Sequence, residues 1–151
     1  MIKPPASKDF PDSFFRVAVK GLCVQDGKVL IFKEDSIIHE GKWELPGGGL
    51  DFGEDPHTGL RREIEEEAGL KVKTISKNPV YVWTCHFENK REMDWYYSLV
   101  LCYRIELENL DFTPTDECVE LGFFSKEDLD NLELCHQTKA FKGVFDPKDF
   151  I

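Results

Sequence analysis

The sequence lacks any long run of apolar residues, and its five cysteines show no CxxC spacing. A secretory signal or a membrane-spanning helix needs such a run, so we expect neither in these 151 residues. The odd number of cysteines disfavours a disulfide framework, and the absence of paired Cys and His ligands disfavours a zinc site. We therefore expect reduced thiols and a cytoplasmic location.

Positive charge is also scarce, because 19 Lys and Arg residues stand against 29 Asp and Glu residues, for a formal net charge of -10. Nucleic acids and anionic membranes are bound by basic surfaces, so we expect neither as a partner. The overall field also repels an anionic substrate. A phosphorylated substrate would therefore need metal ions and a few local basic side chains. The sequence leaves a monomer and a homodimer both open.

The length fits one domain with a sizeable core. Residues 1–12 contain three prolines and little apolar periodicity, so we expect an N-terminal arm there and a single domain over residues 13–151. Strand-like and helix-like segments are interleaved, which predicts an α/β fold with a mixed β-sheet covered on both faces. The expected strands cover residues 14–24, 28–33, 43–45, 72–75, 80–87, 95–107 and 118–124, and the expected helices cover residues 56–68 and 126–132. Residues 138–151 form a tail that we expect to pack on the body.

The best-defined local element is the helix over residues 56–68. Asp55 is a good N-cap residue, and Pro56 suits the first helical position, where a backbone N–H would lack a partner. Gly69 suits the left-handed residue that ends a helix. One narrow stripe of this helix is apolar and is expected to be buried: Leu60, Ile64 and Ala68.

Three glutamates, Glu63, Glu66 and Glu67, lie on the arc beside that stripe. Like charges at these spacings repel each other by a few tenths of a kcal/mol per pair. A solvated acidic face is the alternative explanation, but it usually carries Lys or Arg four residues after each Glu. Here Glu67 and Leu70 occupy two of those places, and the third lies beyond the helix end. We therefore expect the row to hold something positive.

Clustered carboxylates without His or Cys select hard divalent cations, Mg2+ first and Mn2+ second. Such ions neutralise phosphate oxygens and lower the pKa of an attacking water, and a spare carboxylate can accept the proton. The residues therefore predict metal-assisted hydrolysis of a phosphoanhydride.

The wider segment from Gly48 to Leu70 resembles the signature of the Nudix hydrolase family. That signature is Gly, five residues, Glu, seven residues, and then Arg-Glu-aliphatic-any-Glu-Glu-any-Gly-aliphatic. Every fixed position is matched: Gly48, Glu54, Arg62, Glu63, Ile64, Glu66, Glu67, Gly69 and Leu70. The preceding Trp-Glu-Leu-Pro-Gly-Gly-Gly at residues 43–49 also looks like the family's usual lead-in. In the order of its elements, the resemblance extends over residues 14–132.

The resemblance implies an α/β/α sandwich and the following roles for the helix. Glu66 and Glu67 are the leading metal ligands. Glu63 is either a ligand or the general base, so Glu63 and Glu67 are both candidate catalytic residues. Arg62 is expected to orient one of these carboxylates through a charge-assisted hydrogen bond. Glu54 is expected to brace the loop or the surroundings of the metal.

Other candidates lie outside the helix. Gly47 and Gly48 would let the backbone approach metal and phosphates closely, with a backbone carbonyl, assigned to Gly48, as a further ligand; a plain tight turn is the alternative. Glu117 is the candidate for a later acidic ligand, with Glu120 as its alternative. Trp95 and Tyr97 share one face of a strand and could contact a base, although strand aromatics are more often core.

Three functions follow from this resemblance. The first is a Mg2+-dependent pyrophosphohydrolase that converts a nucleoside triphosphate to the monophosphate and pyrophosphate. The second has the same mechanism but acts on ADP-ribose, a nucleotide sugar or a dinucleotide; the proline expected some fifteen residues past the motif in ADP-ribose enzymes is absent. The third is a non-catalytic nucleotide-binding module, which would not need to keep every acidic residue.

Overall fold

The computed structural model describes residues 14–37, 40–86 and 96–150, and the expected arm over residues 1–12 lies outside this range. The described strands form two sheets. The larger sheet has the order β5-β1-β8-β6, with β7 also paired to β8. Its strands are β1 (Phe14–Leu22), β5 (Gly47–Gly49), β6 (Val72–Ile75), β7 (Tyr81–His86) and β8 (Tyr96–Leu107). Because β1 and β8 are parallel and the other pairs are antiparallel, the predicted mixed sheet is confirmed.

The smaller sheet is antiparallel and was not foreseen as a separate unit. Its order is β2-β3-β4, with β9 paired to β3. These strands are β2 (Val24–Gln25), β3 (Lys28–Lys33), β4 (Trp43–Glu44) and β9 (Glu120–Phe124). A tight turn at Asp26-Gly27 joins β2 to β3, and both turn residues have positive φ.

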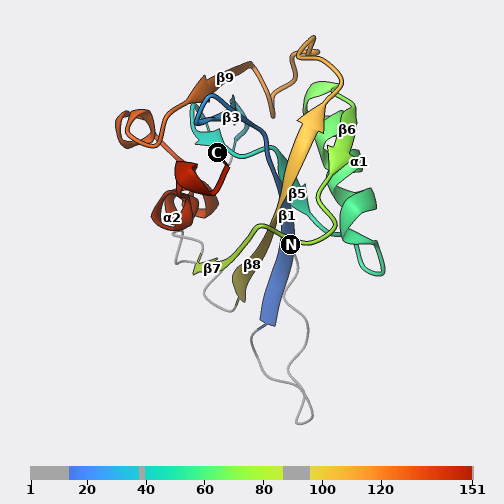
Figure 1. Cartoon of the computed structure of the whole chain (residues 1–151). Coiled ribbons are helices and arrows are strands. Elements are labelled where there is room, and N and C mark those ends of the chain that lie inside the picture. The colour runs from blue at the N-terminus through green and yellow to red at the C-terminus, as the bar shows by residue number, and fades with distance from the viewer. Residues whose placement is uncertain (1–13, 38–39, 87–95, 151) are drawn as a thin grey trace.

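Two α-helices, α1 (Pro56–Ala68) and α2 (His136–Val144), lie on opposite sides of the larger sheet (Figure 1). The side chains of successive strand residues point to opposite faces of the sheet, as the two-residue period of a strand requires. Ala18 belongs to the cluster that contains Phe141 of α2, whereas its neighbour Val19 belongs to the cluster that contains Ile64 of α1. The expected covering of both faces is therefore confirmed.

The ends of α1 are those that the sequence predicts. The Asp55 side chain accepts a hydrogen bond from the Thr58 backbone N–H, and Gly69 has a left-handed conformation with φ of 67°. Gly59 breaks the propensity rule inside the helix for a steric reason. A Cβ at this position would overlap the side chain of Leu50 and come within 2.7 Å of an oxygen of Glu54.

Several expected boundaries were wrong. The first strand ends at Leu22, and the chain resumes as β2 after Cys23. Residues 47–49 form a short strand paired with β1 instead of a turn. The helix expected over 126–132 is only a 3-10 helix at Asp128–Asn131, because Leu132 is extended and leads the chain toward β4. Phe87 and Trp95, at the expected ends of two strands, lie outside the described residues.

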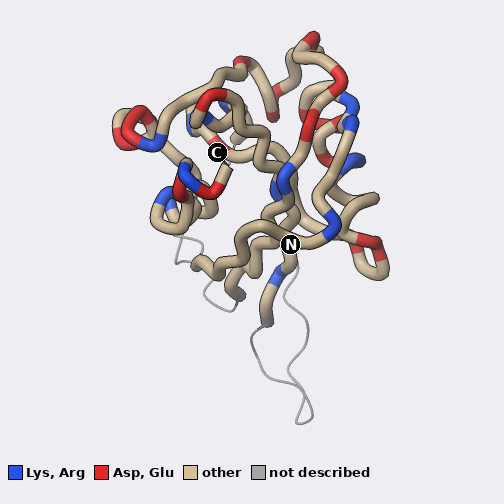
Figure 2. The backbone as a smooth tube through the Cα atoms, in the orientation of Figure 1, with Lys and Arg blue, Asp and Glu red and all other residues tan. Residues whose placement is uncertain are grey.

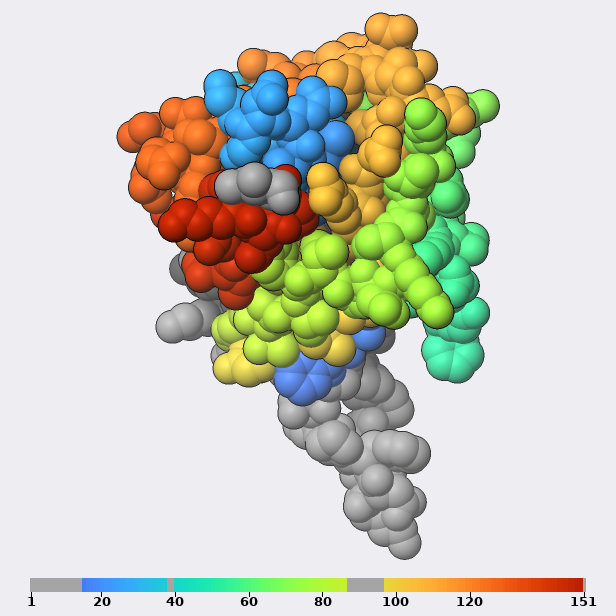
Figure 3. Space-filling model, viewed as in Figure 1, coloured from blue at the N-terminus to red at the C-terminus, as the bar shows by residue number. Residues whose placement is uncertain are grey.

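The C-terminal tail contains a helix that the sequence analysis missed. No side-chain cap marks the start of α2, and its packing is decided by tertiary contacts of Phe141 and the following Phe145, both fully buried. A 3-10 helix, η2 (Pro147–Phe150), follows. The expected packing of this tail on the body is confirmed, since it lies between the β2–β3 hairpin and the start of β7 (Figure 3).

No helix within residues 14–37, 40–86 and 96–150 has the length and apolar character to cross a membrane. Charged residues of both signs are distributed over the strands, helices and connections of the described chain (Figure 2).

Replacing Phe141 tests the importance of the missed helix. The Phe141→Ala variant should lose about 3–5 kcal/mol in the free energy of unfolding, because a fully buried ring leaves a cavity. Urea denaturation measures this loss. The control is Val144→Ala on the exposed side of the same helix, which should change stability far less. A loss below about 1 kcal/mol for Phe141→Ala would mean that α2 does not close the core.

Replacing Gly47 tests the geometry of β5. This glycine has φ of 123°, and a Cβ would overlap the Val19 carbonyl oxygen. The Gly47→Ala variant should therefore lose about 2 kcal/mol or more, measured by denaturant unfolding. Gly143→Ala is the matched control, because nothing lies within 4 Å of that Cβ and alanine favours a helix by about 1 kcal/mol. Equal stability of both variants would contradict the strand geometry.

Candidate functional site

The three glutamates of α1 are graded in exposure. Glu67 is buried at 2% exposure, the Glu63 side chain is 17% exposed and the Glu66 side chain is 57% exposed. The grading follows from the apolar stripe, because Leu60 and Ile64 are fully buried and fix the rotation of the helix. The acidic row therefore runs from the core to the surface, further inward than a row that only borders the buried face.

Strand β5 lies directly against this row. The Gly47 backbone N–H donates a 2.8 Å hydrogen bond to Glu67 Oε1. At Gly48, a Cβ would come within 2.5 Å of Glu63 Oε2, so only glycine leaves room for this carboxylate. The glycine backbone of β5 thus lies close to the acidic row, while its expected approach to metal and phosphates stays a prediction.

Arg62 holds the outer part of the row. Its guanidinium donates to both oxygens of Glu54, at 2.7 and 2.8 Å, to Glu63 at 2.9 Å and to Glu66 at 3.1 Å. It also reaches the Gly49 carbonyl at 3.3 Å. The two-oxygen contact with Glu54 is the geometry in which a guanidinium binds a carboxylate most strongly. Arg62 therefore connects the loop before α1 with the helix and with β5.

These contacts separate the pKa values of the carboxylates. Hydrogen bonds from Arg62 and from the Asp51 backbone N–H lower the pKa of Glu54 to about 2. Burial raises the pKa of Glu63 above its usual value despite the contact with Arg62. Burial raises the pKa of Glu67 even more strongly, and the nearby charge of Lys20 opposes that shift.

The loop after β8 brings Glu117 to the same group. Thr115 ties this loop to α1 because its hydroxyl donates to the Glu67 carbonyl, and the Glu117 backbone N–H donates to the Thr115 hydroxyl. Burial, and then the negative charge of Glu63, raise the pKa of Glu117. Its alternative, Glu120, pairs with Lys33 in the strand ladder and is exposed.

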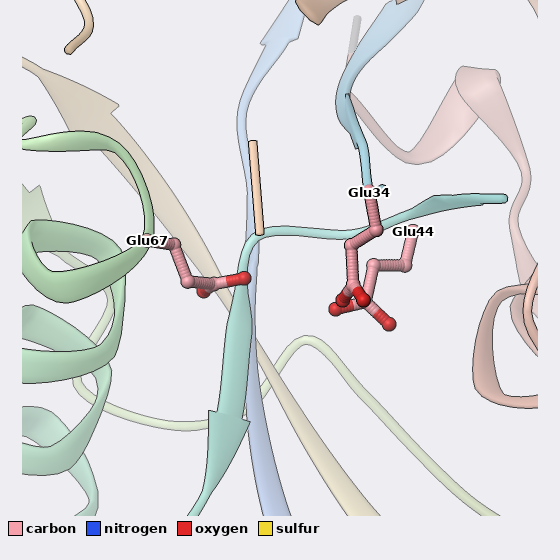
Figure 4. Close-up of side chains that lie close together, drawn as sticks. All are labelled: Glu34, Glu44 and Glu67. Atoms are coloured by element: carbon pink, nitrogen blue, oxygen red, sulfur yellow. The ribbon is translucent and has the colours of Figure 1, made fainter. Parts of the chain in front are cut away.

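A second group of buried charges was missed by the sequence analysis. Glu34, Glu44 and Glu67 each offer a carboxylate oxygen within 4.8 Å of the others, with Glu34 and Glu44 on one side of β5 and Glu67 reaching from α1 on the other (Figure 4). The Lys20 ammonium lies 3.5 Å from Glu44 Oε1. The signal in the sequence was a lysine among the apolar residues of Val-Ala-Val-Lys-Gly-Leu, together with a glutamate between Trp43 and Leu45.

Burial decides the charges in this second group. Desolvation alone lowers the pKa of Lys20, but the carboxylates of Glu44 and Glu67 outweigh it and raise that pKa above its usual value. Burial and a hydrogen bond with Glu44 raise the pKa of Glu34 to about 9. This shift favours the protonated form of Glu34, which is hydrogen-bonded to Glu44, and the Glu44 carboxylate lies beside Lys20.

The aromatic candidates lie elsewhere. Trp95 is outside the described residues. Tyr97 is 48% exposed, and its ring contacts Phe15 and His86, with centroids 6.0 and 4.8 Å away. The contacts of Tyr97 therefore do not join it to the carboxylates, and its contact with a base stays a prediction.

The outer group fits a divalent cation by the chemistry of its donors. Glu63, Glu66 and Glu117 supply carboxylate oxygens without nitrogen or sulfur ligands, which suits a hard cation. Burial and then the negative charge of Glu63 raise the pKa of Glu117, and a positive ion would offset that repulsion. In the inner group, the ammonium of Lys20 already lies beside Glu44. We therefore take the outer group, together with Glu67, as the candidate cation site, although the carboxylates of the inner group also lie close enough together to hold an ion.

Comparison with known proteins gives matches over most of the chain. The family model described as "NUDIX domain" matches residues 14–145. The nucleoside triphosphatase NudI of Escherichia fergusonii is 30% identical over 142 residues, which covers 85% of this chain and 97% of that protein. An ADP-ribose pyrophosphatase of Methanocaldococcus jannaschii is 40% identical over 65 residues, 43% of this chain and 38% of that protein.

A solved structure agrees with these matches. The MutT NUDIX hydrolase from Burkholderia pseudomallei superposes with a TM-score of 0.64 at 25% identity, over 87% of this chain and 98% of that one. The family model covers far more than half of the chain, and the acidic helix, its caps and the glycine strand of the motif are all present. The chain therefore belongs to the NUDIX family of hydrolases.

Proposed function

We propose that this chain is a Mg2+-dependent pyrophosphohydrolase that converts a nucleoside triphosphate to the monophosphate and pyrophosphate. The observation that carries the proposal is the contact between α1 and β5. It places one buried and two more exposed carboxylates beside a glycine backbone that they approach closely. The free state of all five cysteines agrees with the cytoplasmic location that we propose.

The residues of the chain divide the work as follows. Glu66 and Glu67 would hold the cation, with Glu117 as a further ligand and a carbonyl of β5, assigned to Gly48, as the backbone ligand. A bound Mg2+ would neutralise the phosphates and lower the pKa of the attacking water. Glu63 is a second ligand or the group that accepts the proton from that water; its raised pKa suits it to accept a proton.

Arg62 and Glu54 act by positioning. Since Arg62 binds Glu54, Glu63 and Glu66 at once, it keeps the row oriented before any ion arrives. Preorganisation of this kind removes a cost that would otherwise be met during the reaction. Gly47 and Gly48 line the approach of the phosphates, and Trp95 and Tyr97 remain our candidates for contacts with the base.

The similarity to the nucleoside triphosphatase of Escherichia fergusonii favours a nucleoside triphosphate as the substrate, because that match covers 85% of this chain and 97% of that protein. The ADP-ribose pyrophosphatase of Methanocaldococcus jannaschii favours the second candidate, cleavage of ADP-ribose or a related diphosphate, over a shorter match. A non-catalytic nucleotide-binding module is the third candidate. Hydrolysis of any nucleotide in the substrate panel would exclude it, and binding without hydrolysis would favour it.

Removing one carboxylate charge tests the role of α1. The Glu67→Gln variant should lose about 100-fold or more in kcat. It should stay folded, because the glutamine carbonyl oxygen can accept the hydrogen bond from the Gly47 N–H. Steady-state kinetics and thermal unfolding measure the two effects. Glu65→Gln, on the exposed side of the same helix, is the matched control and should keep wild-type kcat. Near-wild-type turnover of Glu67→Gln would rule out this use of the helix.

Removing the cation tests the metal requirement and, with a substrate panel, the substrate. EDTA should abolish the release of pyrophosphate, and excess Mg2+ should restore it. The panel contains nucleoside triphosphates, ADP-ribose, nucleotide sugars and dinucleotides, with products separated by ion-exchange chromatography. We expect the monophosphate and pyrophosphate from a triphosphate as the fastest reaction. Turnover that persists in EDTA would contradict the metal mechanism, and faster turnover of ADP-ribose would favour the second candidate.

A further inference from the structure

Lys20 is a buried cation that has no role in the proposed function. It lies within β1, between Val19 and Gly21, and is 2% exposed. Charged lysines are almost never buried to this degree unless they are paired. Its partners therefore indicate what the charge does.

Among the described residues, the acceptors closest to the Lys20 ammonium come from one short segment, residues 44–47, and Glu67 and Glu34 add negative charge nearby. The ammonium donates to the Gly47 carbonyl at 2.8 Å and to the Leu45 carbonyl at 3.2 Å, and it lies 3.5 Å from Glu44 Oε1. The backbone N–H of the next residue, Gly21, donates to the Pro46 carbonyl at 2.8 Å. Three consecutive carbonyls are thus held by two consecutive residues of β1.

The same segment also binds the carboxylate of Glu67, which lies on α1. The Gly47 N–H binds Glu67 Oε1 at 2.8 Å, while the carbonyl of the same residue binds Lys20. Gly47 is therefore held at both of its backbone polar groups, by a carboxylate on one side and by an ammonium on the other. A shift of this residue would move the atom that orients Glu67.

Stability alone does not account for this charge. Removing an ammonium and a carboxylate from water costs several kcal/mol per ion, and apolar replacement of a whole buried pair is often neutral or stabilising. Methionine would fill the space of Lys20 in the core without that cost. What methionine lacks is the donors to the Gly47 and Leu45 carbonyls.

We propose that Lys20 is a positioning residue, whose ammonium fixes the Gly47 backbone and through it orients the Glu67 carboxylate for the reaction. The proposal rests on the proposed function for its catalytic consequence. Lys20 itself touches neither the cation nor the substrate in this proposal.

A matched pair of variants tests the role of Lys20 without leaving an unpaired charge at Glu44. Lys20→Met alone leaves the Glu44 carboxylate buried without its cation, so it should be strongly destabilised. Lys20→Met/Glu44→Gln removes both charges and should fold. Relative to Glu44→Gln alone, this double variant should lose at least about tenfold in kcat, because displacement of a catalytic group is costly even at small amplitude. Lys28→Met, at an exposed lysine of β3, is the control and should keep wild-type kcat.

A second measurement uses the metal-free wild-type protein and needs no activity assay. Nitrogen-detected NMR of the lysine ammonium groups should show slow proton exchange for Lys20, with a through-hydrogen-bond coupling to the Gly47 carbonyl carbon. In the double variant, the Gly47 and Gly48 amide resonances should shift more than those of α2. The exchange and coupling measurements on the wild-type protein do not depend on how well the variants fold.

The outcomes distinguish the two proposals. A double variant with the kcat of Glu44→Gln, or a wild-type Lys20 ammonium that exchanges rapidly and shows no coupling to Gly47, would overturn the role of Lys20. A wild-type protein that hydrolyses no nucleotide while its Lys20 signals are as expected would overturn the proposed function and leave the geometry of Gly47 in place.

Discussion

The structure depends on the way residues 45–47 are held, because this segment joins both helices to the first strand. Every backbone N–H and C=O in it has a partner. The Leu45 N–H donates to the Thr138 hydroxyl of α2, and the Gly47 N–H donates to Glu67 of α1. The three carbonyls accept from Lys20 and Gly21 of β1. A displacement of either helix would therefore shift β5, where the glycine backbone meets the acidic row.

This arrangement also explains how an acidic chain can keep several carboxylates together. In the inner group, Glu34 is hydrogen-bonded to Glu44, and the ammonium of Lys20 lies beside Glu44. The outer group is balanced only in part by Arg62, which is shared among Glu54, Glu63 and Glu66. The inner group is thus held in a fixed geometry by its own charges. The outer group carries more negative charge than Arg62 alone can neutralise. In the proposed function, a divalent cation bound with an anionic substrate would supply further positive charge.

Much of this was predictable from local sequence. The helix bearing the acidic row was predicted because Asp55 and Gly69 are strong end signals and because the spacing of its glutamates needs no tertiary information. The short strand β5 and the helix α2 were not predicted, since a three-glycine strand has no side-chain pattern and α2 begins without a side-chain cap. Lys20 and Glu44 were missed for a related reason. They are 24 positions apart, and only the pairing of β1 with β5 makes them neighbours.

The central claim is that the carboxylates of α1 and the glycine backbone of β5 form one cation site. Titration of the isotope-labelled protein with Mn2+ tests it most directly, because this paramagnetic ion broadens the amide resonances nearest to where it binds. The account predicts that, at substoichiometric Mn2+, the resonances of residues 47–49 and 63–67 broaden first, ahead of those of the acidic segment Asp128–Asn131. First broadening at residues 128–131, with residues 47–49 unchanged, would contradict it.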